Sequence, residues 1–212
     1  MFGLFGKSKK EAIVKKEAEK IYESIKSEAV IFSIKINSNL PSKYSPIEFQ
    51  VFLEKNIKEF ENKKGTYTDY VLNNKNEFEF AMMIIALIDK LTKKKTYGDF
   101  FFQNIASKIT EDTTRKYNSF MDGGSDAVYN YILEQFNKRQ SDYANVFNSC
   151  KESTDLYMNT AMFLSDQTIA LIEQAKNKKI DIENRTRILM HTSDSQLLIM
   201  KFLKKIFDTL GE

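Results

Sequence analysis

The sequence predicts an all-α protein, a bundle of about six or seven mostly long helices. Its 212 residues include seven glycines and two prolines, and both prolines, Pro41 and Pro46, lie in one stretch. Long segments therefore lack the residues that break helices. In these segments apolar residues recur at steps of three and four, which is the spacing of one helical face. The regular turn signals that a strand-rich fold needs, roughly every ten residues, do not occur.

The composition is that of a globular protein. Hydrophobic residues make up 42% of the chain and charged residues 29%, and both fractions are too high for a disordered chain. A chain of this length can bury roughly 70% of the surface that it exposes when unfolded. We therefore expect a single helical domain over residues 9–212, preceded by a flexible tip over residues 1–8.

The first predicted helix covers residues 9–36. Glu and Lys fill one of its faces, which is typical of a solvated helix surface. Residues 29–36 are rich in branched side chains, so a strand is the alternative there. The opposite face carries a single apolar stripe, formed by Val14, Ala18, Ile21, Ile25, Ala29, Phe32 and Ile36.

A break in the pattern follows at residues 37–46. Ser45 and Pro46 are typical of a helix start, so a second helix is expected after them. Residues 63–65, Lys-Lys-Gly, have the character of its last turn and C-terminal cap. Residues 67–72 are expected to form a short helix or an ordered loop.

The next predicted helix, residues 77–91, is apolar on nearly all sides. It contains the longest uninterrupted apolar run of the chain, from Ala81 to Ile88. A helix without a polar face is buried at the centre of a bundle. A bilayer span requires about 20 consecutive apolar residues, so we interpret this run as a buried helix and not as a membrane anchor.

Three more helices are predicted, over residues 99–117, 126–150 and 154–176. Residues 122–126, Asp-Gly-Gly-Ser-Asp, separate the first two, with Ser125 or Asp126 as the expected N-cap. Two adjacent apolar stripes on residues 154–176 predict a well-buried helix. A last helix, residues 181–210, keeps a heptad-like series with a polar first half and an apolar second half.

The charge pattern and the cysteine content predict a cytoplasmic location, with the inner face of the membrane as an alternative. The one cysteine, Cys150, cannot form an intramolecular disulfide, and the N-terminus lacks the order of a secretory signal. The formal net charge is +3, and only four of the 32 basic residues are Arg. Phosphate recognition usually relies on Arg, so this composition argues against a nucleic-acid partner.

No combination of residues is specific for catalysis or for binding a metal or cofactor. The sole histidine, His191, has only Asp194 nearby and no Glu-x-x-His motif. Cys150 lies in an apolar stripe, which favours a core residue over a reactive thiol, and residues 122–126 lack the lysine of a P-loop. We therefore predict a protein that is not an enzyme, with no catalytic residues, cofactor or metal. The alternative is a small-molecule binder or enzyme whose site forms only when several helices meet.

The N-terminal tip carries a sequence signal for a surface contact. Aromatic side chains beside lysines can insert into a bilayer interface while the lysines meet anionic headgroups. Docking on a protein partner or on the bundle itself is the alternative, and termini commonly fray. The candidate contact residues are Phe2, Leu4, Phe5, Lys7, Lys9 and Lys10.

Taken together, these patterns favour a helical interaction protein, such as an adaptor, assembly factor or regulator that binds another macromolecule. A protein partner is expected, and a peripheral membrane protein anchored by the N-terminal tip is the first alternative. Residues 197–210 are rich in apolar side chains, which belong either to the core or to a homo-oligomer interface of the last helix. Methionines would let either packing adapt.

Overall fold

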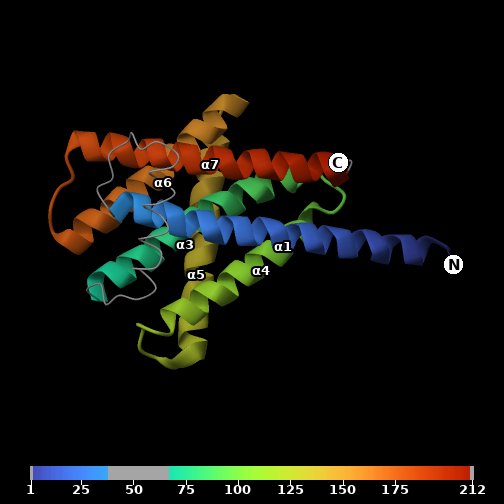
Figure 1. Cartoon of the computed structure of the whole chain (residues 1–212), viewed down its shortest axis with the longest axis horizontal. Coiled ribbons are helices and arrows are strands. Elements are labelled where there is room, and N and C mark those ends of the chain that lie inside the picture. The colour runs from blue at the N-terminus through green and yellow to red at the C-terminus, as the bar shows by residue number, and fades with distance from the viewer. Residues whose placement is uncertain (1, 38–66, 211–212) are drawn as a thin grey trace, which may run out of the picture.

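The computed structural model describes residues 2–37 and 67–210. In these residues the chain forms an all-α bundle without strands, as predicted (Figure 1). Residues 29–36 are helical, which confirms the favoured prediction over the alternative of a strand. The helix expected after Ser45 lies outside the described residues. The described helices are α1 (Phe2–Asn37), α3 (Tyr67–Thr92), α4 (Gly98–Tyr117), α5 (Gly124–Ser149), α6 (Ser153–Lys176) and α7 (Ile182–Leu210).

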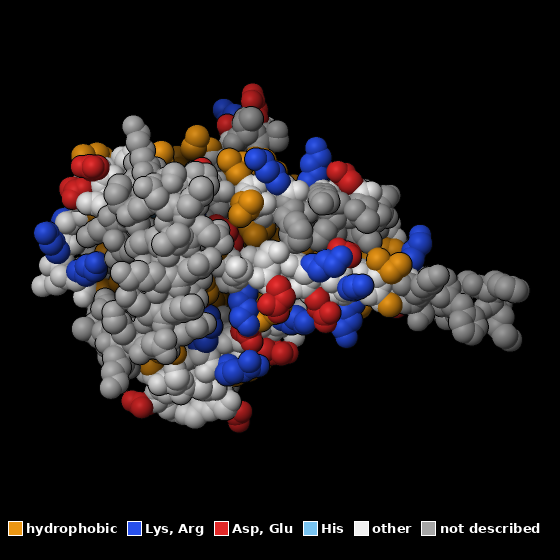
Figure 2. Space-filling view, viewed as in Figure 1, with side chains coloured by type: hydrophobic (Ala, Val, Ile, Leu, Met, Phe, Trp, Pro, Cys, Tyr) orange, Lys and Arg blue, Asp and Glu red, His pale blue; other side chains and the backbone are white. Residues whose placement is uncertain are grey.

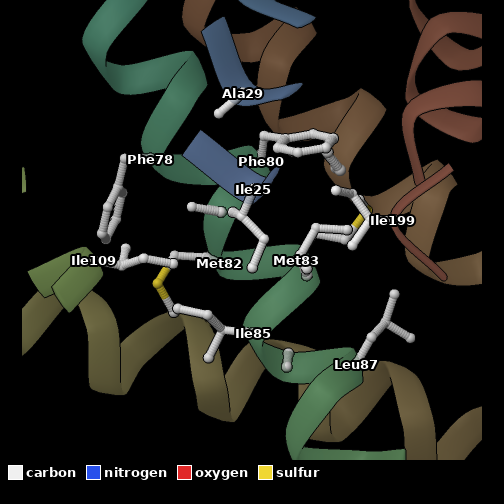
Figure 3. Packing of buried hydrophobic residues seen from close by; sticks show 14 of the residues in the cluster. Ile25, Ala29, Phe78, Phe80, Met82, Met83, Ile85, Leu87, Ile109 and Ile199 are labelled. Carbon is white, nitrogen blue, oxygen red and sulfur yellow. The ribbon is translucent and has the colours of Figure 1, made fainter. Parts of the chain in front are cut away.

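Helix α3 lies at the centre of the bundle and contacts α1, α4, α5 and α6. Residues 80–88 of α3 are all buried, which confirms the predicted central helix. Phe80 stacks on Phe32 of α1, with 5.1 Å between the ring centroids. Figure 3 shows side chains of three other helices around α3: Ile25 and Ala29 of α1, Ile109 of α4 and Ile199 of α7.

Helices α1, α4, α5 and α6 surround α3, and α7 packs outside them on α1 and α6. Figure 1 shows α1 and α7 side by side and running in opposite directions, with α5 crossing them. Helix α4 packs on both α1 and α3, and α6 packs on α3 and α7. The outward faces of α1 and α4 carry mostly charged and polar residues, whereas α6 and α7 also expose large apolar side chains.

Helix α3 is continuous where the sequence predicted two segments, residues 67–72 and 77–91. The intervening residues 73–76 belong to the helix, and the three asparagines among them are buried. Ser33 of α1 donates a hydrogen bond of 3.0 Å to the side-chain oxygen of Asn73. Because a tertiary partner offsets part of the cost of burying these amides, and no Gly or Pro interrupts the backbone, the helix continues through them.

The connection between α4 and α5 covers residues 118–123, so it overlaps the predicted break at 122–126 only at its end, and the predicted side-chain caps do not form. Gly123 is the N-cap of α5, and it has no side chain to offer. The backbone reverses at Gly123 (φ 118°) and Gly124 (φ 79°). Glycine adopts such positive φ angles without steric cost, whereas Ser125 and Asp126 would be strained there and instead lie in the first turn of α5.

Candidate functional site

The N-terminal tip forms the first turns of α1. This helix begins at Phe2, earlier than the predicted residue 9, and the side chains of residues 2–9 lie outside the described part. Figure 1 shows this end of α1 extending past the neighbouring helices, and Lys10 is exposed. The predicted flexibility of the tip stays a prediction, as do the contact roles of Phe2, Leu4, Phe5, Lys7, Lys9 and Lys10.

Helices α6 and α7 expose large apolar side chains. We call this surface the α6–α7 face, and it comprises Met158 and Met162 of α6 and Met190, Leu197 and Leu198 of α7, each about half exposed. The prediction that both stripes of α6 are buried is wrong for Met158 and Met162. The remaining members of that stripe, Ser165, Ile169 and Ile172, are buried, as are Leu164 and Thr168 of the other stripe. Figure 2 shows hydrophobic side chains at the surface along the upper edge of the molecule, where α7 lies.

Two buried carboxylates of α3 pair with cations of α4 and α5. Arg139 of α5 donates two hydrogen bonds of 2.6 Å to the carboxylate of Glu79 and one of 2.9 Å to Asp142. Burial alone would lower the pKa of Arg139, but Glu79 and then Asp142 raise that pKa above its ordinary value. Lys116 of α4 pairs with Glu77. Both oxygens of Glu79 are engaged by Arg139, so this arrangement holds helices together and offers no base to a substrate.

Glu28 of α1 is buried against α7. It is 6% exposed, and Ser195 donates a hydrogen bond of 2.6 Å to its Oε1 atom. Burial raises the pKa of Glu28 above its ordinary value, although the Ser195 bond and the charge of Lys35 act in the opposite direction. Sequence reasoning missed this contact because its two partners lie 167 positions apart and leave no local pattern.

His191 and Cys150 lie in separate environments. Burial, followed by the positive charges of Lys35 and Arg187, lowers the pKa of His191 to about 4, so the ring is neutral at physiological pH. The Cys150 thiol, at the end of α5, donates to the Val146 carbonyl oxygen at 3.2 Å. Neither contact resembles a nucleophile paired with a base.

Polar side chains from three helices converge on a small cavity of about 40 Å³ between α1, α3 and α4. Tyr22 donates to Asp112 there, and the Lys26 Nζ atom lies 3.2 Å from the Asp112 carboxylate. One water molecule occupies about 30 Å³ in the liquid. The cavity is therefore large enough for about one water molecule and too small for an organic substrate.

The described part of the chain contains neither a metal-binding cluster nor a helix suited to cross a membrane. Within residues 2–37 and 67–210, no group of three or more His, Cys, Asp or Glu side chains is placed to hold a metal ion. In the same residues, no helix combines the length and the apolar character needed to cross a membrane. Comparison with known proteins finds no family model, curated protein or solved structure that matches this chain.

We expect Arg139→Met to lower the free energy of unfolding by about 3–5 kcal/mol, because it leaves the buried Glu79 carboxylate without a partner. Chemical denaturation measures this change. The matched control is Arg115→Met, which removes an exposed pair with Asp112 (3.3 Å) and should cost about 0–1 kcal/mol. Equal losses from the two variants would contradict the structural role of the Glu79 pair. A Glu79→Met/Arg139→Met double variant should recover much of the loss.

The buried Glu28 predicts a pH dependence of stability. Its folded pKa lies above its unfolded value, so the folded state holds this proton more tightly, and stability falls as the pH rises through that interval. We expect Glu28→Gln to be more stable than the native protein at pH 7, by about 1–3 kcal/mol, the desolvation cost of a buried polar group. The advantage should shrink as the pH falls through the raised pKa of Glu28 and be small at pH 4, below the ordinary value of 4.5. Denaturation curves from pH 4 to 8 test this, and a difference that does not change with pH would contradict it.

Proposed function

We propose that this protein is a non-enzymatic helical interaction protein of the cytoplasm, which binds a protein partner through the α6–α7 face. The observation that supports the proposal is the exposure of five large apolar side chains on two neighbouring helices. Exposed apolar patches on soluble proteins commonly mark interaction sites. Full burial of one such side chain contributes about 1.5–3 kcal/mol, so covering this face would contribute several kcal/mol to binding before the costs of association.

The chemistry of the α6–α7 face fits an apolar and adaptable partner, such as an amphipathic helix. Three of its five residues are methionine, whose unbranched and polarisable side chain adjusts to different shapes. On α7, the exposed Asp194 and Lys201 lie between and beside the apolar residues and supply a polar rim. Helix-in-groove binding uses apolar anchors at this helical spacing. A second copy of this chain is the other partner that such a face could accept.

We expect a Met162→Lys/Leu197→Lys variant to bind its protein partner more weakly than the native protein does. A lysine at the centre of an apolar interface must be desolvated without a counter-charge, which should weaken binding at least tenfold. Affinity purification from the source cells with quantitative mass spectrometry measures the loss, and sedimentation velocity detects self-association. The matched control is Ile182→Lys, because Ile182 is 77% exposed and lies at the start of α7, outside the face.

The proposal requires that at least one protein be captured by the native chain and by Ile182→Lys but be depleted with the double variant. If the native chain is a dimer and the double variant a monomer, the partner is a second copy of the chain. Equal capture by all three proteins, together with unchanged sedimentation, would contradict binding through this face.

Peripheral membrane association is a second candidate, and it is favoured by the extension of the N-terminal end of α1 beyond the bundle (Figure 1). A protruding end with Phe2, Leu4 and Phe5 beside lysines could reach a bilayer interface without disturbing the fold. In this proposal the protein works at the inner face of the membrane, where anionic lipids attract the lysines.

Liposome flotation tests the second candidate. We expect the native protein to float with phosphatidylserine-containing vesicles and less with purely phosphatidylcholine vesicles, because the lysines need an anionic surface. A Phe2→Ser/Leu4→Ser/Phe5→Ser variant should stay in the bottom fraction. The Met162→Lys/Leu197→Lys variant is the control and should float as the native protein does. Flotation of the triple variant, or no flotation of the native protein, would rule the anchor out.

A further inference from the structure

The turn between α6 and α7 is held in place by Glu173. This carboxylate accepts hydrogen bonds from the Ile180 backbone N–H at 2.9 Å, from Arg185 Nη2 at 2.6 Å and from Lys179 Nζ at 3.2 Å. The Ile180 bond, followed by the two cations, lowers the pKa of Glu173 to about 2. Asn177 ends α6 in the left-handed conformation, with φ at 47°. These contacts fix the shape of the turn.

A cavity of about 200 Å³ lies beside this turn, between the end of α1 and the helices α6 and α7. Its inner wall includes the buried residues Ile36, Ile172 and Ile188. Its polar wall carries four cations, Lys176, Lys178, Lys179 and Arg187, together with the Asp181 carboxylate and the Asn184 amide, so its charge is predominantly positive. Figure 2 shows Lys and Arg side chains gathered at the left end of the molecule, where Figure 1 places the turn. We call this space the turn cavity.

The charges around the turn cavity are not balanced. Residues 173–187 contain five basic and three acidic side chains. Glu173 is paired with Lys179 and Arg185, whereas Lys176 and Lys178 form no ion pair within the described part of the chain.

We propose that the turn cavity binds a small organic anion in which a phosphate or carboxylate group is joined to a compact apolar group, such as an aromatic ring or a short branched chain. An apolar cavity of about 150 Å³ is large enough for benzene, so the isoleucine wall has room for one such group. Lys176, Lys178 and Arg187 would receive the anionic end by charge-assisted hydrogen bonds. This site is independent of the proposed protein partner, because it uses different residues.

Isothermal titration calorimetry with three probes tests the proposal. Phenyl phosphate has both an anionic group for the lysines and a ring for the isoleucine wall. Inorganic phosphate has only the anionic group, and benzyl alcohol has only the ring without a charge. We expect phenyl phosphate to bind at least tenfold more tightly than either of the others, with an affinity that falls as salt is added. Absence of phenyl phosphate binding, or equal binding of inorganic phosphate, would overturn the proposal.

Two variants and a control locate the binding. Lys176→Glu/Lys178→Glu reverses two exposed charges and should reduce phenyl phosphate affinity at least tenfold. Ile180→Phe, which alters a half-buried lining residue, should weaken phenyl phosphate and leave any inorganic phosphate binding unchanged. The control is Lys93→Glu/Lys94→Glu, which makes the same charge change at the exposed turn after α3 and should bind as the native protein does. Equal losses in the lysine variant and this control would overturn the assignment to the turn cavity, and thermal unfolding verifies that each variant is folded.

Discussion

Residues 80–88 of α3 are buried around the whole circumference of the helix, so α3 is stable only when neighbours cover every side of it. Helices α1, α4, α5 and α6 provide this cover. Isolated helices are marginal in water, and most helical stability in proteins comes from packing an apolar face. The arrangement of the described helices follows from this requirement. Each neighbour of α3 contributes one apolar stripe, and α7 packs chiefly on α1 and α6 as an outer element.

The first half of α3 imposes a different constraint, because Glu77 and Glu79 are buried with it. A buried ion pair contributes little net stability relative to an apolar pair of the same size, yet a buried charge without its partner is costly. Lys116 of α4 and Arg139 of α5 must therefore dock in one register, or a carboxylate is left uncompensated. The apolar half of α3 thus supplies stability, and the polar half selects how α4 and α5 pack.

The bundle could be predicted because a helix that is buried on one side has apolar residues at steps of three and four along its sequence. A continuous apolar run such as 81–88 indicates a helix that is buried on all sides. The prediction from sequence was wrong at residues 73–76, because three asparagines there are typical of a loop. The helix continues through them, and Ser33 of α1 gives Asn73 a hydrogen-bond partner that the local sequence does not indicate. The sequence pattern also could not show that the first turns of one α6 stripe lie outside the core, so the exposure of Met158 and Met162 was missed. The Glu28–Ser195 contact joins residues 167 positions apart, and the turn cavity is closed on one side by Ile36 of α1, so neither leaves a local pattern. The basic run at residues 176–179 was visible, but a helix end explains such lysines equally well.

The α6–α7 face and the turn cavity lie on the same two helices, α6 and α7, but at different distances from the turn that joins them. Met158 precedes Lys176 by 18 residues, which corresponds to roughly 27 Å along α6 at 1.5 Å per residue. Leu197 lies about 15 Å along α7 from Arg187 by the same measure. A small anion in the turn cavity therefore lies far from Met158 and Leu197, whereas Met190, three residues after Arg187, is the member of the α6–α7 face nearest to the cavity. Coupling between the two would require α6 to shift against α7, since a ligand acts at a distance only through a change of state. The bonds of Glu173 across the turn oppose that shift, so the geometry favours two independent sites on one rigid pair of helices.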